Sequence, residues 1–122
     1  MAARATWRKY QTIADRYAED VCAGRIAACA STIAACQRHL DDLAQWRRSG
    51  PWTWEPQRGA RVCQFVELMP HVKGPLAGRR IELDPWQVWL LMSVFSWVDG
   101  DGARRFRRAY IEVPRGNAKS TL

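Results

Sequence analysis

The last stretch of the chain constrains its fold more than any other part of the sequence. Residues 109–113 (Ala-Tyr-Ile-Glu-Val) are apolar and β-prone, as expected for a buried strand. A turn with Gly and Asn follows, and then Lys-Ser-Thr at residues 119–121. In a phosphate-binding loop, backbone N–H groups of such a turn hold phosphates, the Lys reaches the β- and γ-phosphates, and the Ser hydroxyl binds Mg²⁺. The order predicts a nucleotide-binding loop over residues 114–121.

This loop departs from the usual pattern in two places. The pattern has Gly six residues before the Lys and again directly before it, where this chain has Val113 and Ala118. A second interpretation therefore stays open, in which the strand simply runs into a basic, frayed C-terminus. The run Arg-Gly-Asn-Ala-Lys-Ser-Thr at residues 115–121 favours the nucleotide loop, because it is more specific than a lone Lys-Ser.

Composition sets broad limits on the kind of protein. The chain has 122 residues, 48% of them hydrophobic, which is enough for the core of a small domain. Its net charge of +7 favours an anionic partner, although the charge is mostly scattered Arg and suits a merely soluble basic protein equally well. The sequence contains no apolar run of about 18 residues, so no membrane span is predicted. The N-terminus lacks the apolar region of a secretory signal.

The cysteines read as core residues rather than as ligands or disulfide partners. The first three, Cys22, Cys29 and Cys36, are evenly spaced, and the fourth is Cys63, so no CxxC metal-binding pair occurs. Free thiols in a core suit a reducing, cytoplasmic setting. The first three fall on an apolar stripe at helical spacing that predicts one buried face: Cys22, Ile26, Cys29, Ile33, Cys36, Leu40 and Leu43.

Helices are predicted over much of the remaining chain. Residues 1–9 are basic and expected to be ragged, and a helix is predicted from about residue 12 to 23. The stripe then continues over residues 25–46, as one long helix or as two in series around Gly24. A further helix opens at Glu55-Pro56, with a predicted core face of Val62, Phe65, Val66 and Met69.

The next predicted helix covers residues 85–98 and is apolar on nearly all sides. Asp84 is a good N-cap, Pro85 suits the first helical position, and Gln87 stands where a capping box needs a Glu or Gln. A helix of this composition should be buried on most sides.

Two groups of polar residues have simple interpretations. His39 stands beside Asp41 and Asp42, which indicates a solvated helix edge rather than a ligand site. Four arginines flank Phe106 before the final strand, and two explanations stay open for them: contacts with phosphate, nucleic acid or an acidic neighbour, or a solvated strand edge. They are Arg104, Arg105, Arg107 and Arg108.

The final segment resembles the ATPase motif of large terminase subunits from tailed phages and prophages. That motif often reads Arg-Lys-Asn-Gly-Lys-Ser and likewise lacks the first Gly of the general pattern. The resemblance continues upstream in the same order, from about residue 12 to 122. It includes residues 17–26, 36–43, Phe-Val-Glu from residue 65, Leu-Asp-Pro-Trp-Gln at 83–87 and the run 104–115.

The resemblance implies a fold and a function. The fold would be mainly α, with a short strand at about 108–113 leading into a Walker A-like P-loop, as the N-terminal part of an α/β ASCE-type NTPase domain. Large terminase subunits are ATP-driven motors that package double-stranded DNA into procapsids, and they also carry a metal-dependent nuclease. The implied partners are double-stranded DNA, the terminase small subunit and the portal, with a homo-oligomeric ring, no membrane, and a location in the host cytoplasm.

Site residues follow from the resemblance by position. Lys119 would hold the β- and γ-phosphates of ATP, and Ser120 would coordinate Mg²⁺. Arg115 would contact the γ-phosphate, which makes Lys119 and Arg115 the implied catalytic residues. The loop residues Gly116, Asn117, Ala118 and Thr121 would complete the cofactor site.

Gln87 has two interpretations that stay equally open. In the family, as in helicases, a Gln at this place reads adenine. The capping box at Asp84 would need the same side chain for helix geometry alone. The two roles are compatible if they belong to different nucleotide states.

The resemblance also implies two weaknesses in this chain. Ala118 stands where the family has Gly, and its methyl group is expected to crowd the backbone near the phosphate and weaken nucleotide binding. The acidic residues of a later strand and the nuclease carboxylates do not occur before Leu122. We therefore expect a truncated N-terminal piece, with a helical segment at 1–50 and the start of the ATPase domain at 51–122, that is inactive by itself.

Two other interpretations compete with the terminase fragment. One is a small basic nucleic-acid-binding or adaptor module, which would bind DNA in a salt-dependent way without nucleotide. The other is a non-functional prophage remnant, because an apolar strand without sheet partners is an aggregation hazard.

Overall fold

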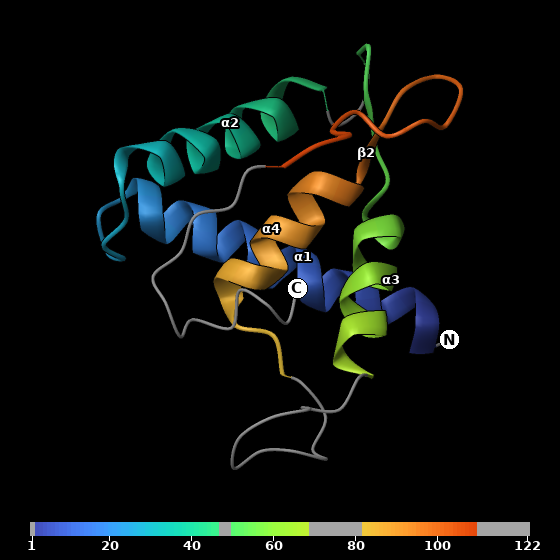
Figure 1. Cartoon of the computed structure of the whole chain (residues 1–122), viewed down its shortest axis with the longest axis horizontal. Coiled ribbons are helices and arrows are strands. Elements are labelled where there is room, and N and C mark those ends of the chain that lie inside the picture. Colours follow the sequence, from blue (N-terminus) through green and yellow to red (C-terminus); the bar gives the residue numbers. More distant parts are fainter. Residues whose placement is uncertain (1, 47–49, 69–81, 110–122) are drawn as a thin grey trace.

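The structure is a computed structural model that describes residues 2–46, 50–68 and 82–109 (Figure 1). Within these residues the chain forms four helices and one small antiparallel sheet. The elements in order are α1 (Ala2–Cys22), α2 (Ala30–Trp46), β1 (Thr53–Trp54), α3 (Pro56–Glu67), α4 (Pro85–Phe95) and β2 (Trp97–Val98).

Helix α1 is the element on which the other helices pack. It contacts α2, α3 and α4, and Figure 1 shows it running behind α4. Its buried face includes Tyr10, Ala14, Ala18 and Val21, a helical spacing that keeps these side chains on one side. Ala14 and Ala18 are fully buried, and their small side chains let a neighbouring helix approach closely. One hydrophobic cluster thus joins residues on both sides of position 50.

The first helix starts earlier than predicted. Residues 1–9 were expected to be ragged, but α1 begins at Ala2. This stretch is rich in Ala, Arg and Lys, which favour helix, and Trp7 packs partly against the core. Tyr10 is buried one turn later, so the start of α1 is held by tertiary contacts as well as by propensity.

Gly24 separates α1 from α2, so the prediction of two helices in series is the correct alternative. Gly24 has φ of +82°, a left-handed conformation that glycine adopts without the steric cost of a side chain. Its N–H donates to the Val21 carbonyl at 3.1 Å, and the Arg25 N–H donates to the Asp20 carbonyl at 2.8 Å. These bonds satisfy carbonyls at the end of α1 and turn the chain toward α2.

The predicted apolar stripe is only partly correct. Cys36 and Leu43 are buried, but Cys29 is exposed and 41% of Ile33 is accessible to solvent. All buried residues of α2 lie from Cys36 onward. The predicted apolar face is therefore not buried over the first turns of α2, because this part of the helix does not reach the core.

Helix α4 ends earlier than the predicted residue 98. Its last helical residue is Phe95, and the Ser96 N–H closes the helix with a bond to the Met92 carbonyl at 3.1 Å. Trp97 and Val98 form β2 instead and pair with Trp54 and Thr53 in an antiparallel register. Both β2 residues are 1% exposed, so burial of a β-prone pair between the helices outweighs continuation of the helix.

Helix α3 packs against α4 at a small residue. Gly59 is buried, and a Cβ added there would lie 2.9 Å from the Met92 Cα and would also meet the Ser96 hydroxyl. The buried face of α3 also differs from the predicted one. Phe65 was expected in the core but is 61% exposed, whereas Cys63, beside the predicted face, is fully buried.

The prediction of a mainly helical fold is confirmed for the described residues. Arg108 and Ala109, at the start of the predicted strand, have no regular structure, and residues 110–122 lie outside the described part of the chain. No helix in the described ranges has the length and apolar character needed to cross a bilayer.

Replacing Gly59 with Ala should destabilise the protein by about 1–3 kcal/mol, because the new methyl group meets the α4 backbone. In a helix Gly→Ala alone would be stabilising, so a loss can be attributed to the contact. Gly100→Ala is the control, since a Cβ there meets nothing within 4 Å. Urea unfolding of the two variants measures the difference, and equal stabilities would contradict the packing argument.

Candidate functional site

Gln87 is the predicted site residue whose position the structure describes. It lies in the first turn of α4 and is 2% exposed. Its side-chain Oε1 accepts a hydrogen bond from the Asp84 backbone N–H at 2.8 Å, as in a capping box. The capping role is therefore present in the fold. A side-chain amide oxygen has two lone pairs and its nitrogen two donors, so this bond does not use the full capacity of the group.

The other predicted site residues lie outside the described part of the chain. They are Arg115, Gly116, Asn117, Ala118, Lys119, Ser120 and Thr121. Their assignment as a phosphate-binding loop stays a prediction from the sequence.

A groove of about 1110 Å³ lies beside α4 and α2. Both helices pack on α1, and Tyr17 of α1 contributes to its lining. The groove is lined by Trp86 in the first turn of α4, by Trp97 just beyond its C-terminal end, and by Ala109, where the described chain ends. The groove therefore connects the two ends of α4.

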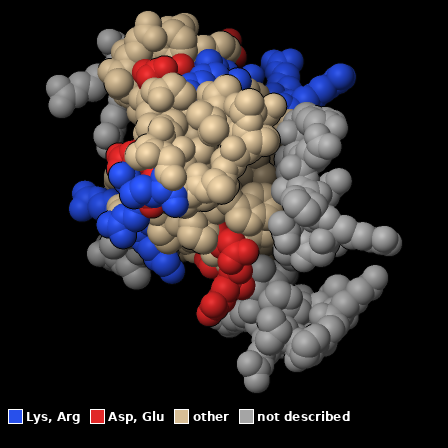
Figure 2. Space-filling model, turned by 90° about the vertical axis from the view of Figure 1, so that its left-hand side faces the viewer, with Lys and Arg blue, Asp and Glu red and all other residues tan. Residues whose placement is uncertain are grey.

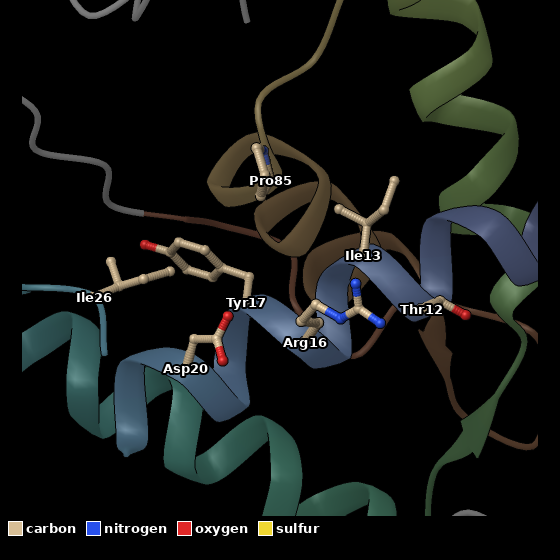
Figure 3. A pocket seen from close by; sticks show the side chains of 7 residues that line it. All are labelled: Thr12, Ile13, Arg16, Tyr17, Asp20, Ile26 and Pro85. Atoms are coloured by element: carbon tan, nitrogen blue, oxygen red, sulfur yellow. The ribbon is translucent and has the colours of Figure 1, made fainter. Parts of the chain in front are cut away.

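A smaller cavity of about 230 Å³ lies between α1 and the first residue of α4 (Figure 3). In this view the ring of Tyr17 lies between Ile26 and Pro85. Asp20 at its edge is paired with Arg25 at 2.7 Å. The wall is mostly hydrocarbon and contains none of the predicted site residues. The full lining is Thr12, Ile13, Arg16, Tyr17, Asp20, Ile26 and Pro85.

His39 is a core residue, which corrects the prediction of a solvated edge. Its side chain is 2% exposed. Its Nε2 lies 3.0 Å from Asp15 Oδ1 on α1, and its Nδ1 lies 3.2 Å from Ser93 Oγ on α4. The imidazole therefore joins three helices through its two ring nitrogens. Sequence reasoning missed this group because its partners are 24 and 54 residues away.

The series Ser93, His39 and Asp15 has the order of a nucleophile, a base and an orienting acid. Acyl transfer also needs preorganised N–H donors beside the nucleophile to stabilise an oxyanion. Ser93 lies inside α4, where backbone N–H groups are engaged in the helix. The arrangement thus has the chemistry of a polar connection between helices rather than of a hydrolase.

Arg105 is largely enclosed and is paired with an acidic neighbour, so the first of the two sequence interpretations of the arginine run holds for it and the solvated strand edge does not. Its Nη1 donates to Asp42 Oδ2 at 2.7 Å, and the two side chains are 15% and 10% exposed. Asp42, also predicted on a solvated edge, is therefore part of a buried ion pair. The neighbouring Arg104, Arg107 and Arg108 are all exposed. Arg104 also stacks on the ring of Phe95, with its guanidinium carbon 5.2 Å from the ring centroid.

Among the residues that the structure describes, the charged side chains do not form a continuous basic track on the face shown in Figure 2. Neutral side chains cover most of this face, and Lys and Arg gather at its margins with acidic groups beside them. This distribution gives little support to a nucleic-acid interface on this face.

The cysteines differ in their ionisation. Burial, with a smaller Coulombic contribution from Cys22, raises the pKa of the Cys36 thiol to about 12. Burial and the nearby Glu67 raise the pKa of Cys63 to about 12. Hydrogen bonding to Thr32 lowers the pKa of Cys29, whose Sγ lies 3.3 Å from the Thr32 hydroxyl just before α2. Among the described residues no cluster of His, Cys, Asp or Glu could hold a metal ion.

Comparison with known proteins finds a family match at the C-terminal end of the sequence. Residues 85–122 match the family described as terminase large subunit, ATPase domain. The match begins at Pro85, the first residue of α4, and includes Gln87 and the whole predicted loop. It confirms the predicted resemblance to the terminase large subunit over these residues. No curated protein and no solved structure matches the chain.

Alkylation with iodoacetamide at neutral pH should modify Cys29 first, because it is exposed and its pKa is lowered. Cys36 and Cys63 should react only on unfolding. Mass spectrometry of peptides after a time course measures the order, and early labelling of Cys36 would contradict its burial.

The same two buried thiols should make stability depend on pH. Each thiol has a higher pKa in the folded state than its ordinary value of 9.0, so the folded state binds the proton more tightly. The resulting stability is fully present below pH 9, where the thiol is protonated in both states. This stability should be lost progressively as the pH rises from 9 toward 12. Replacing both cysteines with Ala should flatten the fall in the unfolding midpoint over that range.

Proposed function

We propose that this chain forms the start of the ATPase domain of a phage or prophage terminase large subunit. The family match over residues 85–122 carries this proposal, because it includes the predicted adenine residue and the predicted phosphate loop in the expected order. Residues 1–50 then form an N-terminal helical segment, and residues 51–122 form the first part of an ASCE-type NTPase domain.

ATP and Mg²⁺ are the proposed ligands. Lys119 binds the β- and γ-phosphates, Arg115 contacts the γ-phosphate, and Ser120 provides the hydroxyl for Mg²⁺. The backbone of residues 116–118 and the side chain of Thr121 complete the loop. Bound Mg²⁺ neutralises phosphate charge during phosphoryl transfer.

The chemistry of Gln87 fits the adenine end of such a ligand. An amide can accept a hydrogen bond from the adenine N6 amino group and donate one to N7. The oxygen has a second lone pair beside the capping bond, and the nitrogen has two donors. Gln87 is 2% exposed and does not line the groove, so this role requires its side chain to become accessible in the nucleotide-bound state.

In the complete motor these residues would drive packaging of double-stranded DNA into procapsids. The partners would be the terminase small subunit and the portal, with several large subunits in a ring in the host cytoplasm. Hydrolysis by the motor also needs acidic residues of a later strand, which hold Mg²⁺ and activate water.

Two alternatives remain beside the terminase fragment. One is a small nucleic-acid-binding or adaptor module, and the other is a non-functional prophage remnant. The net charge of +7 favours the adaptor module. The pairing of Arg105 with Asp42 and the scattered basic groups of the described residues in Figure 2 speak against it. Strong salt-dependent DNA binding in the absence of nucleotide would favour the alternative. A single hydrophobic cluster built from all four helices speaks against a remnant that does not fold.

The loop assignment predicts opposite effects for two substitutions. Lys119→Ala should abolish binding of a fluorescent ATP analogue, because the phosphates lose their cationic contact. Ala118→Gly should strengthen binding by roughly tenfold, because the methyl group that crowds the phosphate is removed. Equilibrium titration in Mg²⁺ measures both, and equal affinity of all three proteins would refute the loop.

Gln87→Glu separates the two roles of this residue. Glu is a normal capping-box residue, so the unfolding midpoint should change little. A carboxylate cannot donate to adenine N7, so affinity for ATP should fall by about tenfold or more. Thermal unfolding and ATP titration of the same samples give the comparison. Unchanged ATP affinity would leave Gln87 with its capping role only.

A further inference from the structure

Helix α4 is covered by the other described helices on only part of its apolar surface. It packs on α1 and on α3. Another side of the helix carries Trp86, Leu90 and Val94, which are four residues apart and therefore share one face. These side chains are only half-buried, and all three line the groove beside α2. The groove is thus the place where the apolar surface of α4 stays partly open.

Small side chains on α2 form the opposite wall of the groove. Ser31, Thr32 and Ala35 line it from the first turns of this helix. Helices α2 and α4 both pack on α1 (Figure 1), but they make few direct contacts with each other. Tyr17 of α1 also contributes to the lining. The groove therefore has an aromatic and aliphatic wall on α4 and faces a wall of small side chains across a volume of about 1110 Å³.

The charged side chains that line this groove leave an excess of positive charge. Arg38 and Arg108 are exposed and form no ion pair with any described residue. The guanidinium carbon of Arg38 lies 5.0 Å from the ring centroid of Phe106, and a stacked guanidinium keeps its N–H donors for other partners. Asp42, the acidic residue of the described lining, is already paired with Arg105 at 2.7 Å. A molecule that complements the groove should therefore carry negative charge.

Trp89 adds a hydrogen-bond donor that the described chain does not use. Its side chain lines the groove and is 9% exposed. Its indole Nε1 is enclosed and has no hydrogen-bond partner among the described residues. Buried donors are nearly always paired, so an acceptor atom of a bound molecule would satisfy this group. The indole also lies 5.6 Å from the ring of Tyr17, which extends the aromatic wall.

We propose that the groove between α2 and α4 binds a small planar aromatic molecule that carries an anionic group. The aromatic part would lie against Trp86 and Leu90, because flat rings stack well on indole. The anionic group would face Arg38 and Arg108, whose N–H groups suit a carboxylate, sulfonate or phosphate. The volume is close to that of small-molecule clefts, which favours such a ligand over a protein segment. This site is built from described residues and would exist whether or not the chain binds ATP.

A matched pair of fluorescent probes tests both parts of the proposed ligand. Anilinonaphthalene sulfonate is an aromatic anion, and phenylnaphthylamine has the same ring system without the charge. Fluorescence titration of the full chain gives the affinity for each probe and the number of sites. Near-UV circular dichroism and a cooperative thermal transition establish that each sample is folded, because loosely packed states also bind the anionic probe.

Substitutions separate the anionic contact from the aromatic one. Arg38→Gln combined with Arg108→Gln should weaken binding of the sulfonate about tenfold and leave affinity for the neutral probe unchanged. Trp86→Ala should weaken binding of both probes, because it removes part of the aromatic wall. Arg16→Gln is the matched control, since it removes an exposed charge that lines the smaller cavity and not the groove.

One saturable sulfonate site with this pattern of losses would support the groove as a binding site. The proposal is wrong if the folded parent protein has no saturable site, if Arg16→Gln causes the same loss as the double variant, or if the neutral probe loses as much affinity as the sulfonate. A loss in Lys119→Ala without a loss in the double variant would assign the probe to the predicted phosphate loop. That result would overturn the groove site and leave the proposed function intact, which ATP titration tests separately.

Discussion

The contact of α1 with the other three helices is the constraint on which the structure depends. Ala14 and Ala18 are fully buried on α1, and they leave room for neighbouring helices to pack closely. Gly59 does the same where α3 meets α4. Dense packing of this kind has little tolerance for added volume. These small residues therefore fix the place of α4, which carries Gln87 in its first turn and leads at its other end into Trp97, one of the rings around Arg105.

Two polar connections within this core set the arrangement of α2. His39 joins α1 and α4 through Asp15 and Ser93, and Asp42 pairs with Arg105. Breaking a buried ion pair by removing one partner typically costs about 3–5 kcal/mol, because the other charge stays buried and unpaired. Such pairs tolerate few alternative arrangements. The segment that leads into the predicted loop is consequently tied to α2 and not only to the small sheet.

The sequence was most informative where the physical signal is local. Pro85 and Gln87 predicted the start of α4, and the Asp84 bond to Gln87 follows that prediction. Gly24 marked the break between α1 and α2 because a left-handed residue is favoured there. The end of α4 could not be found in the same way. Trp97 and Val98 suit a helix or a strand, and pairing with residues 53–54 decided between them.

By itself, the sequence determined the helical character of the chain and the motif at residues 115–121, including its resemblance to the terminase family. Local propensity, capping residues and motif spacing depend only on neighbours along the chain. Tertiary structure alone decided that His39 and Asp42 are buried while Ile33 and Phe65 are exposed. Burial depends on which helix faces meet, and these are set by partners dozens of residues away, such as Arg105 for Asp42 and Ser93 for His39.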